Sequence, residues 1–356
     1  MPTVTVLLPT YRSERYLPEC VESVLSQSYG DFELLVVDDS PGDQTQSMLN
    51  SFGDRRIRVI RGRDRGLADA LNLGLLRAEG AYIARIDADD LMAKERLARQ
   101  VSHMDAHPET AVCGSWQQYF GLRSYCHRPS ASAEQCKANL LFRCDLCHST
   151  LMMRKSFFLE HGLFYDGRFA AEDYELWTRV LDRGRIENIP AVLGYYRDDG
   201  AGVTEKKMDR LVREHGEIVA AALKRSLQIN LPEEQRKLFP GWISPFHDPR
   251  SEILPENREA AQEELKRLFE TILLRNRMVG QYDETALRKT IAAEWAALRY
   301  REPYRIPEKP VPEHALFRRR GRLERLWHKT EQFLADYREP KQKYIKIRTK
   351  LEQLKR

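Results

Sequence analysis

Along the first part of the chain, short apolar runs alternate with segments whose apolar residues recur at helical spacing. The apolar runs predict buried strands at residues 3–8, 32–37, 57–61, 81–86, 111–116, 151–153 and 191–196. The periodic segments predict helices at 13–25, 44–52, 67–76, 93–107, 155–161 and 171–183. Because strands that alternate with helices usually pair in parallel, we predict an α/β, Rossmann-like fold with a mostly parallel sheet flanked by helices.

The pattern changes after about residue 204, where strand-like runs cease and long amphipathic segments take over. We expect helices at 205–227, 260–279 and 284–300, a proline-containing linker at 231–257, and a basic helical segment after the four prolines of 303–312. The sequence therefore predicts two domains, an α/β domain at 1–204 and a mostly helical C-terminal extension with a basic tail at 205–356.

The composition is that of a globular protein: 356 residues, 42% of them hydrophobic, are enough to bury a full core. No apolar run approaches the roughly 18 residues that cross a bilayer, and Pro9 breaks the N-terminal apolar segment. We therefore expect no transmembrane helix and no signal peptide, and a cytoplasmic location. Of the six cysteines, only Cys144 and Cys147 have a metal-binding spacing, which favours free thiols over a zinc site.

The net charge of +5 is unevenly spread, because residues 318–325 and 341–356 are strongly basic. Such a tail favours an anionic partner, and we hypothesise peripheral docking at the inner face of the cell membrane. A solvated helical face or a dimer contact is the alternative, and the oligomeric state stays open. Because the tail lacks an aromatic-studded recognition motif, we expect no nucleic-acid partner.

Three carboxylates, Asp87, Asp89 and Asp90, follow the strand predicted to end at residue 86. Carboxylates so close together repel one another, and a hard divalent cation such as Mg²⁺ or Mn²⁺ would offset that repulsion. On local grounds, a solvated turn whose aspartate caps the next helix explains them equally well. Segments 9–11 and 38–39 also follow predicted strands, so the three polar clusters should converge on one crevice at the carboxyl ends of a parallel sheet.

Six segments resemble, in order and spacing, the family 2 glycosyltransferases, which have the GT-A fold. They read VTVLLPTYRSERYL, FELLVVDDS, RGLADALNLGL, AEGAYIARIDADDL, HSTLMMRKS and AEDYELW. The resemblance runs from Val4 to about Arg197 and leaves the C-terminal extension unmatched. It implies a metal-dependent, inverting enzyme of the hexosyltransferase type, which moves a sugar from a nucleotide diphosphate sugar to an acceptor hydroxyl.

On the donor side, the resemblance implies a nucleotide site. The residues that would border the base are Pro9, Thr10 and Tyr11. Asp39, or its neighbour Asp38, would accept the hydrogen bond that N3 of uracil donates. We therefore expect the donor to be a UDP-sugar.

The resemblance places the diphosphate, the sugar and the metal further along the chain. The segment 65–72, which includes Arg65 and Asp69, would line the diphosphate and the sugar, although many relatives carry Asn at the position of Arg65. Asp89 would be the principal metal ligand of an Asp-x-Asp motif, and Asp87 would approach the ribose and the metal. Asp90 would support this site or touch the sugar.

On the acceptor side, an inverting transfer needs a carboxylate that takes the proton from the attacking hydroxyl. The resemblance implies Asp173 as this general base, with Glu172 orienting it or binding the acceptor. The residues expected to contact the acceptor or the sugar are Asp90, His148, Trp177 and Arg197. The structural alternatives stay open, namely acids that cap the first turn of a helix for 172–173 and a buried, backbone-bonded histidine for His148.

This chain lacks two motifs that occur in family 2 glycosyltransferases, one common in the family and one typical of its processive members. Relatives often carry Arg-x-His after the last strand, whereas this chain has Arg197-Asp198-Asp199, so the histidine's contact is missing or comes from a carboxylate. The Gln-x-x-Arg-Trp signature of processive synthases is absent, which favours addition of one sugar. We expect a glycan or lipid-linked acceptor in the synthesis of a cell-surface polysaccharide or lipopolysaccharide. The alternatives are a non-catalytic sugar-nucleotide or glycan-binding module and a nucleotidyltransferase.

Overall fold

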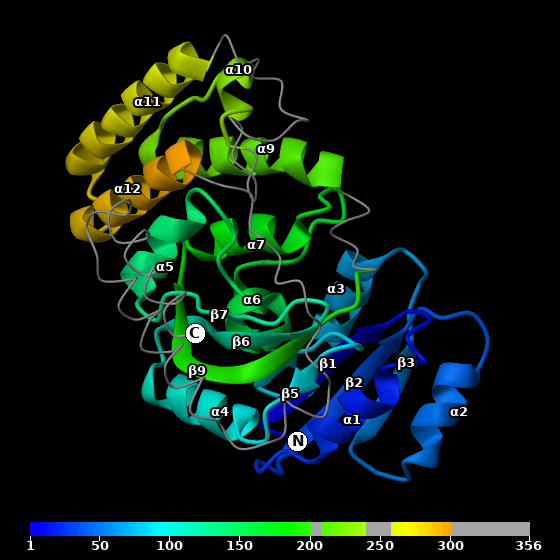
Figure 1. Ribbon diagram of the computed structural model, residues 1–356. Coiled ribbons are helices and arrows are strands. Elements are labelled where there is room, and N and C mark those ends of the chain that lie inside the picture. The colour runs from blue at the N-terminus through cyan, green and yellow to red at the C-terminus, as the bar shows by residue number, and fades with distance from the viewer. Residues whose placement is uncertain (201–207, 240–257, 301–356) are drawn as a thin grey trace, which may run out of the picture. The chain divides into compact units, whose positions relative to one another are not determined.

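A computed structural model describes residues 1–200, 208–239 and 258–300 of the chain (Figure 1). Within these residues, a nine-stranded sheet has the order β3-β2-β1-β4-β8-β6-β9-β5, and β7 pairs with β6. Its first four strands run parallel and are β1 (Val4–Thr10), β2 (Phe32–Asp38), β3 (Ile57–Arg61) and β4 (Tyr82–Arg85). Their carboxyl ends therefore meet at one edge of the sheet, as the sequence predicts.

The other half of the sheet is mixed. Its strands are β5 (Leu91–Met92), β6 (Thr110–Gly121), β7 (Cys126–His127), β8 (Met152–Arg154) and β9 (Arg185–Asp198). β8 is antiparallel to β4 and β6, whereas β6 and β9 run parallel to each other along their whole length. Both long strands exceed their predicted ranges, mainly at 117–121 of β6 and 185–190 of β9, because polar residues interrupt the apolar pattern in these two segments.

The helices are α1 (Leu17–Leu25), α2 (Gln44–Ser51), α3 (Leu67–Arg77), α4 (Arg96–Ala106), α5 (Ala133–Leu140), α6 (Lys155–Glu160), α7 (Glu172–Val180), α9 (Met208–Leu227), α10 (Glu233–Arg236), α11 (Arg258–Val279) and α12 (Glu284–Tyr300). Two apolar cores cover the two faces of the sheet. On β1, Leu7 points into one core while Val6 and Leu8 point into the other, so this strand is buried on both faces. This explains its uninterrupted apolar sequence.

The helices after β9 share one of these cores with the α/β domain. Leu223 of α9, Leu268 of α11 and Leu287 of α12 belong to the same buried cluster as Trp177 of α7. Gln135 of α5 also donates a hydrogen bond of 2.7 Å to the hydroxyl of Thr290 on α12. The described helices of the extension are thus packed on the sheet's core, while the domain boundary at residue 204 stays a prediction.

The basic tail predicted to dock at a membrane lies outside the described residues. Among the helices that the structure does describe, none has both the length and the apolar character needed to cross a bilayer.

Candidate active site

A cavity of about 680 Å³ receives the carboxyl ends of several strands, together with the start of α7 and one face of α9. Nine residues predicted for the site line it: Pro9, Thr10, Tyr11, Asp39, Asp87, Asp89, His148, Glu172 and Asp173. The other predicted residues, Asp38, Arg65, Asp69, Asp90, Trp177 and Arg197, are not in its lining. The structure therefore brings some, but not all, of the residues predicted for the nucleotide, together with those predicted for the metal and the base, to a single cavity.

At the ends of β1 and β2, backbone contacts fix Asp39 at the cavity. Its amide donates a 2.9 Å hydrogen bond to the carbonyl of Thr10, and its Oδ1 accepts a 2.9 Å bond from the amide of Asp64. A Cβ on Gly62 would come within 1.9 Å of that Oδ1, so a larger residue at position 62 would have to displace the carboxylate of Asp39. Asp38 is instead buried, and its Oδ1 accepts from the amide of Ser40 at 2.9 Å. Of the two alternatives, Asp39 is the one that faces the cavity.

An aromatic ring stands next to Asp39 at the cavity wall. Tyr11 is 52% exposed, although it follows directly on the buried strand β1. The next residue, Arg12, has a φ of 51°, and its amide donates to the hydroxyl of Ser40 at 2.9 Å. This left-handed turn ends the strand and leaves the tyrosine ring half exposed, with the guanidinium of Arg12 at 5.2 Å from its centre.

The loop between β3 and α3 reaches the cavity through Gly66 and Leu67 rather than through the predicted side chains. Arg65 is exposed, and Asp69 forms an ion pair of 2.9 Å with Arg63. Their predicted contacts with the diphosphate and sugar would therefore need a side-chain movement of Arg65 or a change of partner for Asp69.

The acid cluster after β4 carries more negative charge than its surroundings offset. The guanidinium of Arg85 makes a two-pronged contact with the carboxylate of Asp87. Burial, and then the charge of Asp87, raises the pKa of Asp89 to about 6. The same two causes raise the pKa of the fully buried Asp90, whose Oδ2 has no hydrogen-bond partner within the described residues.

A second, wholly buried arginine supports this cluster from behind. Arg96 donates hydrogen bonds to the carbonyls of Arg85, Ser149 and Leu151, at 2.8, 2.7 and 3.1 Å. It thereby ties β4 to the segment before β8. The sequence does not single out Arg96, because an arginine at the start of a predicted helix is ordinarily solvated.

The acid cluster fits a divalent cation of a particular kind. Among the described residues, no three His, Cys, Asp or Glu side chains converge as a metal cage. Mg²⁺ and Mn²⁺, however, are often held by one or two carboxylates, with water and substrate phosphates completing the coordination. Asp89, which lines the cavity and bears a raised pKa, suits that arrangement. Asp87 would first have to leave Arg85.

Asp173 lies in the first turn of α7 at another wall of the cavity. Its Oδ1 accepts a 2.7 Å hydrogen bond from the amide of Tyr174. Its Oδ2 is 4.0 Å from Nδ1 of His148 and 3.9 Å from Sγ of Cys144. Burial raises the pKa of this carboxyl, which makes the carboxylate a stronger base than an exposed aspartate.

His148 connects Asp173 to a fixed tyrosine. Its Nε2 is 2.9 Å from the hydroxyl of Tyr165, and its ring meets the indole of Trp177 edge-on at 5.8 Å. Burial, and then the charge of Arg85, lowers the pKa of His148 well below its usual value, so the imidazole is neutral at pH 7. Trp177 itself is completely buried and belongs to the core.

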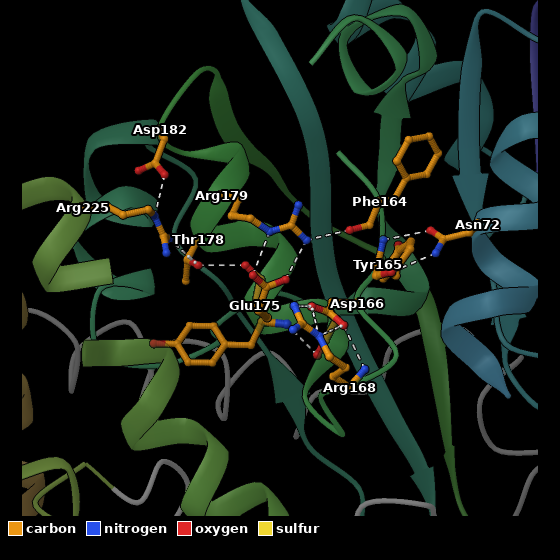
Figure 2. Close-up of polar contacts among 12 residues, drawn as sticks. Asn72, Phe164, Tyr165, Asp166, Arg168, Glu175, Thr178, Arg179, Asp182 and Arg225 are labelled. Carbon is orange, nitrogen blue, oxygen red and sulfur yellow. Dashed lines mark hydrogen bonds and ion pairs between the residues drawn. The ribbon is translucent and has the colours of Figure 1, made fainter. Parts of the chain in front are cut away.

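The backbone around Tyr165 is held on both sides (Figure 2). Asn72 of α3 makes two 2.8 Å hydrogen bonds with the amide and carbonyl of Tyr165. Arg179 of α7 donates to the carbonyl of Phe164 at 2.6 Å and pairs with Glu175 at 2.6 Å. Asn72 therefore orders the segment that carries Tyr165, a role that its place in the predicted donor segment did not suggest.

Three tyrosines form an aromatic group in the cavity lining. The ring of Tyr119 on β6 lies 4.2 Å from that of Tyr125 and 4.6 Å from that of Tyr196 on β9. The sequence does not predict this group, because Tyr119 and Tyr125 lie between the predicted strands at 111–116 and 151–153, where no helix or strand is expected. Their only signal was an excess of tyrosine beside a predicted strand end.

Arg197 braces the acid loop instead of lining the cavity. Its Nε donates to the carbonyl of Asp89 at 3.0 Å, and its backbone amide donates to Oδ1 of Asp90 at 2.9 Å. The guanidinium also reaches Glu19 at 2.5 Å and lies 4.4 Å from the ring centre of Tyr16. Asp90 and Arg197 thus support the loop from behind, which agrees with the first of the two roles implied for Asp90.

An acid loop after a parallel strand, an acid at a later helix start and a shared cavity between them, on this mixed sheet, define a glycosyltransferase of the GT-A fold. The model of the family described as "Glycosyl transferase family 2" matches residues 5–166. The chain belongs to this family.

The chain is 34% identical over 208 residues to the "Putative glycosyltransferase EpsE" of Bacillus subtilis, covering 56% of this chain and 74% of that protein. It is 28% identical over 228 residues to an Escherichia coli protein, covering 63% and 88%. That protein is the "UDP-Glc:alpha-D-GlcNAc-diphosphoundecaprenol beta-1,3-glucosyltransferase WfaP". The crystal structure of S. aureus TarS 1–349 in complex with UDP has a TM-score of 0.52 at 17% identity, covering 83% and 90%. The last comparison shows the shared fold.

Proposed function

We propose that this glycosyltransferase moves one sugar from a UDP-sugar to an acceptor hydroxyl, with inversion and with the help of Mn²⁺ or Mg²⁺. The observation that carries the proposal is that Asp39, Asp89 and Asp173, from three separate elements, line one cavity. WfaP is named for a UDP-glucose donor and TarS binds UDP, which supports this nucleotide. Asp-lined clefts of non-catalytic binding modules or nucleotidyltransferases would not need a carboxylate at the position of Asp173.

On the donor side, the half-exposed ring of Tyr11 would offer a stacking face for the base. Oδ2 of Asp39 would accept from N3 of uracil, while Oδ1 keeps its bond to Asp64. Asp89 would hold the cation, which when bound offsets the negative charge that builds on the departing diphosphate. Arg85 would add a fixed positive charge beside it.

On the acceptor side, Asp173 would take the proton from the acceptor hydroxyl as that oxygen attacks the anomeric carbon. The bond between this carbon and the diphosphate oxygen breaks, and its electron pair leaves with UDP. Attack from the face opposite the leaving group inverts the configuration. Glu172, which lines the same cavity, would orient the base or bind the acceptor.

The acceptor would lie between Asp173 and the tyrosines at 119, 125 and 196, because these aromatic side chains line the cavity and aromatic rings suit contact with a sugar ring. The name of WfaP specifies an acceptor sugar on a diphosphoundecaprenol lipid, which supports a lipid-linked acceptor and a place in polysaccharide synthesis. Docking of the basic tail at the inner face of the cell membrane would bring the cavity to such a lipid.

Calorimetry with UDP, GDP and dTDP, with and without Mn²⁺, tests the donor site. We expect UDP to bind with Mn²⁺ and to lose at least about tenfold in affinity, roughly 1.4 kcal/mol, in Asp89→Asn. Asp43→Asn, an exposed acid at the start of α2, is the matched control and should bind as the wild type does. Binding of no nucleotide under any condition would refute the proposal and favour a glycan-binding module.

Inversion is tested separately. Once a UDP-sugar that the wild type turns over has been found among UDP-glucose, UDP-galactose and UDP-GlcNAc, proton NMR of the first product reports its anomeric configuration. An α-linked donor should give a β-linked product. Retention would exclude Asp173 as the base of a single displacement.

A further inference from the structure

The helix α9 meets the catalytic part of the chain at the start of α7. Leu211 and His215 of α9 line the same cavity as Asp173. Between them in the sequence, Glu214 directs its carboxylate to the backbone just before α7. The family model ends at residue 166, so it includes neither the base nor this helix.

The backbone just before α7 finds its hydrogen-bond acceptor on another helix. The helix begins at Glu172, and its N-cap residue, Ala171, makes no capping side-chain hydrogen bond. The first amides of a helix have no partner within it, so a carboxylate there is favourable both as an acceptor and as a charge at the positive end of the helix dipole. Oε2 of Glu214 accepts from the amides of Ala170 and Ala171, at 2.5 and 3.2 Å.

The carboxylate of Glu214 is itself held in place. Only 8% of this residue is exposed, and its Oε1 accepts a 2.6 Å hydrogen bond from Nε of Arg210, one turn earlier on α9. Arg210 also donates to the carbonyl of Arg168. Arg210 and Glu214 together make hydrogen bonds to both ends of the backbone segment 168–171. This segment immediately precedes Glu172 and Asp173.

Further contacts fix α9 against α7. Nε2 of His215 donates to the carbonyl of Phe142 at 2.7 Å, and its ring stacks on that of Tyr174 at 4.9 Å. At the other end of α7, Arg225 of α9 bonds to Asp182 at 2.8 Å and to Thr178 at 2.9 Å, as Figure 2 shows. The position of Glu214 is therefore determined by contacts along the whole of α7.

We infer that Glu214 is a positioning residue: from the C-terminal extension, it sets the place of the Glu172-Asp173 backbone and hence of the general base. This inference rests on the proposed function, since it assumes that Asp173 takes the acceptor's proton. Rate depends steeply on such placement, because a misplacement of about 1 Å can cost on the order of a hundredfold. The donor residues lie on other elements and should be unaffected.

The experiment compares Glu214→Ala and Glu214→Gln with Glu217→Ala, an exposed glutamate on the same helix. The probe is UDP release from the UDP-sugar that the wild type turns over fastest. In Glu214→Ala we expect kcat to fall about 10- to 100-fold, with the KM of the donor and the Kd of UDP within about twofold of the wild type. Glu214→Gln keeps an oxygen for the two amides and should recover part of the loss, whereas Glu217→Ala should match the wild type.

A second readout does not depend on activity. Hydrogen exchange, followed by mass spectrometry of peptides across residues 166–177, should show faster exchange of the amides of Ala170 and Ala171 in Glu214→Ala. Peptides of β1 and β4, and the same peptides in Glu217→Ala, should exchange as in the wild type.

The outcomes separate the two proposals. A wild type that binds no nucleotide and releases no UDP refutes the proposed function, whatever the exchange data show. An active wild type with an unchanged kcat in Glu214→Ala refutes the positioning role. An equal loss of UDP affinity and of kcat would also overturn it, because that result indicates a general structural defect instead of a displaced base.

Discussion

The two sides of the cavity are assembled in different ways. The donor side comes from short loops after β1, β2 and β4, which are neighbours in the sheet and follow one another closely along the chain. The acceptor side gathers Tyr119 of β6, His148 before β8, Asp173 of α7 and His215 of α9, which are spread over about a hundred residues. A local pattern therefore encodes the donor side, whereas packing of distant elements creates the acceptor side.

The largest expected effect is that of Asp173→Asn, which should lower kcat without weakening the binding of UDP. Asp173→Asn keeps the size of the side chain and its bond to the amide of Tyr174 but removes the carboxylate proposed as the base. We expect kcat to fall on the order of 10³-fold, about 4 kcal/mol in the activation free energy, while UDP binds as in the wild type. Steady-state UDP release and calorimetry measure the two quantities.

Glu172→Gln is the control, since it changes the adjacent acid of the same turn and should cost less than Asp173→Asn. If kcat falls less in Asp173→Asn than in Glu172→Gln, Glu172 is the better candidate for the general base. The roles proposed for the other residues of the site would not change.

Gly62→Ala tests the role proposed for Asp39 on the donor side. The added methyl group would overlap Oδ1 of Asp39 and displace it from the amide of Asp64. We expect the Kd of UDP to rise about tenfold to thirtyfold, roughly 1.4–2 kcal/mol, with kcat at saturating donor little changed. Gly30→Ala, where a Cβ has open space, should bind UDP normally. Normal binding in Gly62→Ala would exclude Asp39 from base recognition.

The acceptor side also carries a pH-dependent stability. Burial lowers the pKa of His215 to about 4, against about 6.5 in the unfolded chain. As the pH falls, His215 therefore becomes protonated in the unfolded chain before it does so in the folded protein. The free energy of unfolding decreases as the pH falls from about 6.5 to about 4, and this group causes no further change below that range. This single group should cost about 2 kcal/mol between pH 7 and pH 5. Urea unfolding of the wild type and His215→Gln at both pH values measures it, and equal pH dependence in the two would contradict the assignment.

The same division explains how far the sequence predicts the molecule. Strands β1 to β4 were predicted because each is a short apolar run that ends at a polar loop. The predicted fold class is confirmed. The C-terminal half of β6 and the N-terminal half of β9 were missed, because polar residues such as Gln117 and Asn188 interrupt the apolar pattern there. Helix α5 and the short β5 have no strong periodic signal either.

Within the site, the sequence predicts which acids gather but not how they are neutralised. Arg85 ends β4 and Asp87 follows two residues later, so a continued strand alternation would place them on the same face, and this pair was open to prediction. Arg96 under the acid loop and Glu214 at the start of α7 were not, because each acts on a backbone far away in the sequence. Their partners are peptide groups, which carry no sequence signature.

The smallest expected effect tests whether the link from Asn72 through Tyr165 to His148 matters for the base. Tyr165→Phe keeps the buried ring and the backbone bonds to Asn72, but removes the hydroxyl 2.9 Å from Nε2 of His148. A neutral imidazole that loses this partner turns more freely beside Asp173, so we expect kcat to fall about threefold to tenfold, near 1 kcal/mol, at an unchanged Kd for UDP. Tyr29→Phe, away from the cavity lining, should have no effect on UDP release. If Tyr165→Phe instead weakens UDP binding, Tyr165 supports the donor side through Asn72 and α3. His148 would then contribute to both sides of the cavity.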